Sequence, residues 1–116
     1  MKTFFKAFSY AWMGIMHGAT RERNVKFHLM AAIVVIVVGG LTGLSQFEWI
    51  IITAVIALMI ALELMNAAVE RVVDLVTQER HPLAKQAKDL AAGAVLVFSI
   101  ASAIIGLLIF LPKWLM

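Results

Sequence analysis

The sequence contains no cysteine, only two prolines and few charged residues, which make up 15% of the chain. Without cysteine the protein has no disulfide bond, thiolate nucleophile or zinc-thiolate site. The sequence also lacks the glycine-rich phosphate-binding loops of the Walker and protein-kinase types. What remains is strongly apolar, because hydrophobic residues make up 63% of the chain, whereas soluble domains contain about 45–50%. The composition therefore predicts a membrane protein.

Three apolar segments are long enough to cross a bilayer, which takes about 20 helical residues. We expect these spans at about residues 27–46, 48–70 and 90–112. The expected fold class is an all-α integral membrane protein. A chain of 116 residues is short for two domains, so residues 1–116 are expected to form a single domain. A domain this small exposes much of its surface, which lipid or sister subunits must cover.

The basic residues are distributed unevenly about the predicted spans. Nine of the ten fall on one side: Lys2, Lys6, Arg21, Arg23, Lys26, Arg71, Arg80, Lys85 and Lys88. Only Lys113 falls on the other. Basic residues accumulate on the cytoplasmic side of membrane proteins, so we expect the N-terminus inside and the C-terminus outside. The net charge of +3 gives no indication of a nucleic-acid partner.

The segment before the first span has the pattern of a helix lying on the membrane. Large apolar side chains recur there at helical spacing: Phe4, Phe8, Trp12 and Ile15. We therefore expect an amphipathic surface helix over about residues 2–20. A cleaved signal peptide is the competing interpretation, but Lys6 interrupts its apolar core and no small-residue cleavage pattern follows.

Four polar residues continue the second span on one helical face. At 100° per residue, this face carries Glu63, Asn66, Glu70 and Asp74. With the outer boundary near Trp49, Glu63 lies roughly 10 Å inside the apolar layer. An ionised carboxylate is costly there, which makes Glu63 a functional candidate. The alternative is structural: hydrogen bonds to neighbouring helices, with the outer carboxylates solvated and paired with arginine.

Polar residues also flank the first and third spans on the same side. Glu22 precedes the first span, and Lys88 precedes the third. Carboxylates of Glu22 and Glu70 can hold Mg²⁺ and leave its other positions to water and nucleotide phosphates, while Lys88 can neutralise a phosphate. The alternative is a basic flank that binds anionic lipid headgroups. The three histidines, His17, His28 and His81, are too dispersed for a metal-ligand pattern.

Four motifs are distributed along the chain. They are Tyr10-x-Trp12-x-Gly14, Glu22 ahead of Asn24 and Phe27, the segment from Glu63 through Asp74, and His81-Pro-Leu-Ala-Lys-Gln-Ala-Lys88-Asp89-x-Ala-Ala-Gly-Ala-Val. With these motifs the sequence resembles the prokaryotic diacylglycerol kinase family. The Arg-Asn-x-Lys-Phe-His run at residues 23–28 and the Pro-Leu-Ala after His81 are most similar to its Gram-positive undecaprenol kinase branch, which makes a polyprenol the first-choice acceptor.

The resemblance implies a lipid kinase in the bacterial inner membrane, built as a homotrimer of three-span subunits. It would transfer the γ-phosphate of ATP to undecaprenol, giving undecaprenyl phosphate, or to diacylglycerol, giving phosphatidic acid. Carried over residue by residue, Glu63 becomes the general base and Asn66 its neighbour in the catalytic site, and Mg²⁺ binds to Glu22 and Glu70. The implied nucleotide-binding residues are Tyr10, Glu22, Glu70, Glu79, His81, Lys88 and Asp89. Asp74 is expected to be structural.

Two other classes of protein compete with the kinase interpretation. In a small proton-coupled transporter, Glu63 would bind and release protons as it faces alternating sides of the membrane. Small multidrug exporters have four spans, however, and a carboxylate in the first of them, whereas this chain is expected to have three. A purely structural membrane subunit is the third possibility, and it would tolerate Glu63→Gln.

Overall fold

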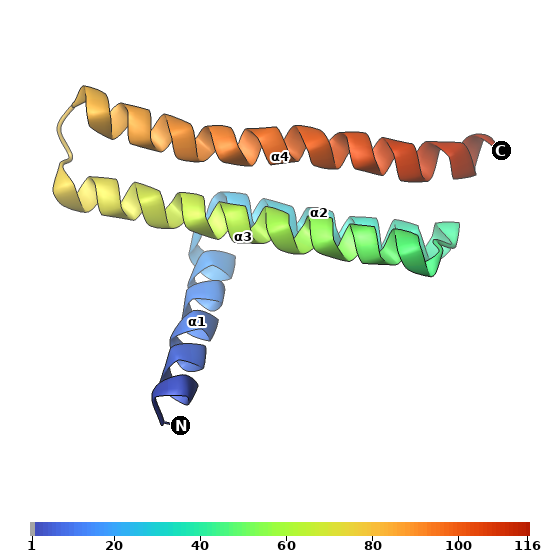
Figure 1. Ribbon diagram of the computed structural model, residues 1–116, viewed down its shortest axis with the longest axis horizontal. Coiled ribbons are helices and arrows are strands. Elements are labelled where there is room, and N and C mark those ends of the chain that lie inside the picture. Colours follow the sequence, from blue (N-terminus) through green and yellow to red (C-terminus); the bar gives the residue numbers. More distant parts are fainter. Residues whose placement is uncertain (1) are drawn as a thin grey trace.

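The computed structural model describes residues 2–116, which form four helices. They are α1 (Lys2–Arg21), α2 (Arg23–Thr42), α3 (Gln46–Val76) and α4 (Pro82–Leu115). The last three run side by side, and α1 projects from them at a steep angle (Figure 1). The expected all-helical fold is therefore confirmed.

Helices α2, α3 and α4 are each long and apolar enough to cross a membrane, which confirms the three expected spans. The protein is thus a multi-pass membrane protein. At 1.5 Å per residue, the 31 residues of α3 and the 34 of α4 extend over about 46 and 51 Å, more than the apolar layer of about 30 Å. Both helices therefore continue into a polar region, and their excess length carries the charged residues around the α3–α4 connection.

Local signals in the sequence define the ends of these helices. Helix α2 ends at Thr42, short of the expected limit at residue 46, because Gly43 adopts a left-handed conformation with φ 82°. Ser45 and Glu48 then form a capping box that starts α3. Helix α4 starts at Pro82, well before the expected limit at residue 90, because the His81 ring caps the N-terminus.

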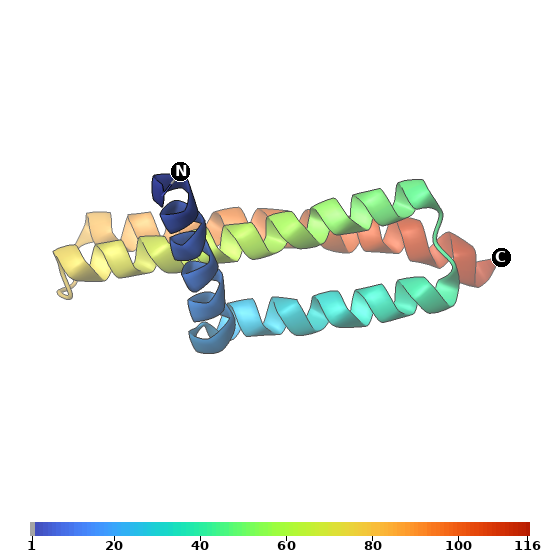
Figure 2. The ribbon, with the colours of Figure 1, turned by 90° about the horizontal axis from the view of Figure 1, so that it is seen from below.

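The C-terminal end of α4 is attached to the α2–α3 turn. Lys113 Nζ lies 3.0 Å from Oε1 of Glu48, and Trp114 donates from Nε1 to the hydroxyl of Thr42 at 3.0 Å. Both contacts lie at the end of the molecule opposite the α3–α4 connection (Figure 2). They fix the order of the three long helices at this end.

The buried apolar core lies in the same half of the molecule. Ile52, Ile109 and Phe110 form its centre, and Trp49 packs against it. Gly39 lets the Trp49 ring approach α2, since a Cβ at Gly39 would lie 2.8 Å from the ring. Most other apolar side chains on the long helices stay exposed in the single chain, as expected for surfaces that meet lipid or another subunit.

Helix α1 contacts the other helices only near its C-terminal end. Residues 2–17 are exposed, and Gly18 is the one buried residue of this helix. The side chain of Leu64 occupies the space where a Cβ of Gly18 would lie, so glycine permits the crossing of α1 over α3. The rest of α1 projects away from the bundle (Figure 1).

Two adjacent glycines should respond differently to the same substitution. Replacing glycine by alanine favours the helix by about 1 kcal/mol at either position. The new Cβ would collide with neighbouring side chains at Gly39, whereas a Cβ at Gly40 would have no neighbouring atom within 4 Å. We expect G39A to be less stable than G40A by about 1–3 kcal/mol, the typical effect of overpacking. Reversible unfolding in mixed micelles measures the difference, and equal stabilities would contradict the packing described here.

Candidate functional site

Glu63 is buried at the middle level of the molecule, with 3% of its surface exposed. Its partner comes from α2, where His28 places Nε2 3.1 Å from Oε1 of Glu63. The His28 side chain is itself only 19% exposed. A buried carboxylate needs such a partner, because desolvation without hydrogen bonding is costly.

Asn66 lies one turn beyond Glu63 on the same face of α3 and is also buried. Within residues 2–116, no hydrogen-bond donor reaches its Oδ1 atom. Buried amide oxygens are normally paired, so this one has spare capacity to accept a hydrogen bond. The predicted catalytic pair, Glu63 and Asn66, thus occupies one buried patch of α3.

A second cluster joins α1, α2 and α3 one turn further along. The guanidinium of Arg71 pairs with Glu22, the residue that connects α1 to α2. A second contact runs from Arg71 Nη2 to Nε2 of His17 at 3.0 Å. These three side chains line a cavity of about 310 Å³ beneath α1. Sequence reasoning found Glu22 but missed Arg71 as its partner.

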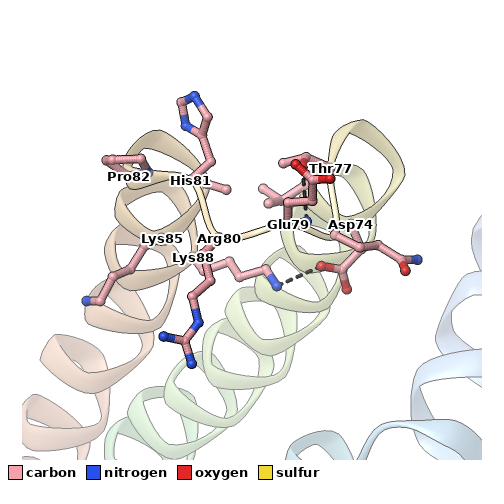
Figure 3. Close-up of a pocket in the computed structure, with 11 residues that line it drawn as sticks. Asp74, Thr77, Glu79, Arg80, His81, Pro82, Lys85 and Lys88 are labelled. Carbon is pink, nitrogen blue, oxygen red and sulfur yellow. Dashed lines mark hydrogen bonds and ion pairs between the residues drawn. The ribbon is translucent and has the colours of Figure 1, made fainter.

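A third cluster surrounds a pocket of about 720 Å³ at the α3–α4 connection. Lys88 reaches from α4 to Asp74 on α3, with Nζ 2.7 Å from Oδ1 (Figure 3). Glu79 and His81 also line this pocket. Of the predicted nucleotide-binding residues, Glu79, His81 and Lys88 therefore share one cavity, and Asp74 joins them.

Electrostatics link this pocket to α3. The hydrogen bond to Asp74 raises the pKa of the Lys88 amine, and the charges of Asp74 and Glu70 act in the same direction, while burial opposes them. Lys88 therefore stays protonated at neutral pH. Glu70 thus lies within electrostatic reach of Lys88, as well as next to Arg71 in the chain.

Two predicted residues lie apart from these clusters within the single chain. Tyr10 is 65% exposed on the projecting part of α1. Asp89 does not line the α3–α4 pocket, but it pairs with Lys85, which does, with Nζ 2.6 Å from Oδ2. Within residues 2–116 of the single chain, neither side chain forms an ion pair or hydrogen bond with Lys88.

The carboxylates suit Mg²⁺ in their donor chemistry. Glu22 is partly exposed and Glu70 is exposed, and both present oxygen atoms at the charged end of the spans. Over residues 2–116, no group of three or more His, Asp or Glu side chains forms a complete metal cage. Mg²⁺ typically takes one or two protein carboxylates and completes its shell with phosphates and water, so both carboxylates are donors of the kind this ion prefers, and Glu22 would have to release Arg71 to bind it.

Together these features define a multi-pass membrane protein with a polar site where its spans meet the aqueous phase. The buried carboxylate of Glu63 lies further into the bundle, and the pockets that contain Arg71 and Lys88 lie nearer the α3–α4 connection. The chain belongs to the prokaryotic diacylglycerol kinase family, whose sequence model matches residues 9–110. The family resemblance noted from the motifs is thereby confirmed, and the protein is an ATP-dependent lipid kinase.

Several curated relatives agree with this assignment. An undecaprenol kinase of Bacillus subtilis is 55% identical over 113 residues, covering 97% of this chain and 92% of the relative. A diacylglycerol kinase of Synechocystis is 41% identical over 94% of this chain, which spans 63% of that longer protein. A diacylglycerol kinase of Escherichia coli is 27% identical over 85% of this chain and 81% of its own length. These comparisons do not support the transporter interpretation.

The Lys88–Asp74 contact predicts a shift that can be titrated. In Asp74→Asn the pKa of Lys88 should fall, because the carboxylate that raises it is gone. Because the pKa of Lys88 is raised in the fold, the contact stabilises the wild-type protein at neutral pH. This contribution is lost as the pH rises through the pKa that Lys88 has in the folded protein. NMR of labelled lysine Cε measures the midpoint, with Lys85, paired to Asp89, as the internal control. An unchanged Lys88 midpoint would exclude the contact.

Proposed function

We propose that this protein phosphorylates undecaprenol at the cytoplasmic face of the bacterial inner membrane, with diacylglycerol as the second-choice acceptor. The observation that carries the proposal is the burial of Glu63, with Asn66 beside it, just below the charged end of the spans. The undecaprenol kinase of Bacillus subtilis, at 55% identity, supports the choice of acceptor. A lipid hydroxyl reaches this level while the nucleotide stays in water.

Glu63 acts as the general base in this mechanism. It takes the proton of the lipid hydroxyl as that oxygen bonds to the γ-phosphorus of ATP. The bond from this phosphorus to the β–γ bridging oxygen breaks, and ADP leaves. Asn66, buried one turn beyond Glu63 on α3, orients the incoming alcohol through its side-chain amide. No phosphoenzyme forms.

The nucleotide binds at the charged end of α3 and α4. Lys88, held by Asp74, lies against the phosphates, and Glu79 and His81 contribute the pocket wall. Tyr10 and Asp89 complete the nucleotide site. Glu22 and Glu70 would hold Mg²⁺, which would neutralise negative charge on the phosphates. Phosphoryl transfer mainly requires positioning and charge compensation, so these few side chains suffice.

The same arrangement orients the protein in the membrane. The basic residues at the α3–α4 connection and along α1 favour the cytoplasm for that end, which leaves the C-terminus outside. The steep angle of α1 to the spans and the exposed aromatic residues Phe4, Phe8 and Trp12 support a surface helix at headgroup level (Figure 1).

The proposed assembly is a homotrimer, and the wide apolar faces left exposed by one chain support it. Native mass spectrometry of the protein released from detergent should therefore give the mass of three 12.8 kDa chains. Chemical crosslinking in native membranes provides an independent readout. A monomer in both experiments would rule out the trimer.

The activity test uses purified protein in mixed micelles with labelled Mg-ATP, and offers undecaprenol and diacylglycerol in parallel. We expect phosphorylation of undecaprenol to exceed that of diacylglycerol. Glu63→Gln should lower kcat by about 10²–10⁴-fold, the usual contribution of a general base, with ATP binding retained.

The matched control is Glu48→Gln, which makes the same chemical change near the N-terminus of α3. Glu48 pairs there with Lys113. This variant should keep wild-type activity. Full activity of Glu63→Gln would refute the base assignment. Transfer to neither alcohol, with a known kinase active in the same micelles, would refute the proposed acceptors.

A further inference from the structure

Glu63 is held by a single polar contact. Over residues 2–116, its only ion-pair or hydrogen-bond partner is Nε2 of His28, 3.1 Å from Oε1. The side chains one turn away on α3 are Met59, Ile60, Asn66 and Ala67, which include no cation. The orientation of the carboxylate therefore depends on a residue of another helix.

Close packing surrounds the turn of α2 that precedes His28. Val25, one turn earlier on α2, has only 2% of its surface exposed and lies near Gly18 of α1. Leu64, the neighbour of Glu63 in the chain, fills the space beside the same glycine. The three helices thus meet tightly beside the His28–Glu63 pair, which limits how far either side chain can move.

His28 also faces an apolar cavity of about 320 Å³ between α2, α3 and α4. Val35, Met59 and Phe110 are among its lining residues. The imidazole is one of the few polar groups of a largely apolar space, together with the hydroxyls of Ser99 and Ser102. His28 thus contacts Glu63 and also borders this cavity.

We infer that His28 is a positioning residue for Glu63 in the proposed lipid kinase reaction, an inference that rests on the proposed function. Nε2–H donates to Oε1 and fixes the carboxylate, while the second oxygen takes the proton of the lipid hydroxyl. His28 exchanges no proton with substrate in this scheme. Its contribution is to the geometry of proton transfer, so it should affect kcat rather than nucleotide binding.

The test compares three variants of the full-length protein in mixed micelles. His28→Leu fills similar space but has no hydrogen-bond donor. The side chain of His28→Asn carries a donor but is too short to reach Glu63. The longer side chain of His28→Gln places its amide donor within reach of Glu63. We expect kcat to fall by about 10²-fold in H28L and H28N, as for a misplaced catalytic group, and to recover largely in H28Q. The KM for ATP should stay unchanged in all three.

A double-mutant cycle separates positioning from a loss of folding. When Glu63→Gln already removes the base, adding H28L should lower kcat no further, because the two residues act as a unit. Thermal melting and gel filtration monitor folding, and H28N keeps the question answerable if H28L does not fold. Equal losses in H28L and H28Q, or additive losses with E63Q, would overturn the inference.

The outcomes also separate this inference from the proposed function. Wild-type protein that is active, depends on Glu63 and keeps its kcat in H28L would overturn the role of His28 alone. Activity that survives E63Q would overturn the base assignment and, with it, the role of His28. Recovery in H28Q together with non-additivity supports the inference.

Discussion

The pairing of one buried carboxylate with a histidine from a neighbouring helix constrains the rest of the structure. An ionised Glu63 among apolar helices would cost several kcal/mol without a hydrogen-bond donor. His28 supplies that donor from α2. The two helices must therefore keep their register at this level, and the tight contact of Val25 with the region of Gly18 maintains it. A preorganised site thus follows from the need to satisfy a buried charge.

The remaining polar contacts are arranged in order along the bundle. At the end formed by the α2–α3 turn, Glu48–Lys113 fixes α3 against α4. Apolar packing around Ile52 occupies the next level, and the Glu63 pair follows it. Beyond them, the Glu22–Arg71 and Asp74–Lys88 contacts join all four helices at the charged end. This order separates a region suited to lipid from one suited to phosphate. An enzyme that transfers a phosphate group from ATP to a lipid requires both.

Much of this arrangement was predictable because it depends on periodicity within single segments. Uncharged apolar runs identified three spans, and the helical repeat placed Glu63 and Asn66 on one face. His28 was missed because partners were sought only one turn away on the same helix. Arg71 was missed as the partner of Glu22 for the same reason, since only tertiary packing joins them. The boundary between α2 and α3 was readable in the sequence. The Ser45–Glu48 capping box marks the start of α3, so α2 has to end before it, at Gly43.

A single chain leaves the proposed nucleotide site open on one side. Lys88, Glu79 and His81 share a pocket, whereas Tyr10 extends away on α1 and Asp89 lies on another face of α4. The apolar faces of α4 are also largely exposed. In the proposed trimer, a neighbouring subunit can cover these faces and bring its own α1 or α4 to the pocket of the first chain. Trimer formation would then serve two purposes, burying apolar surface and completing the set of groups that surrounds ATP.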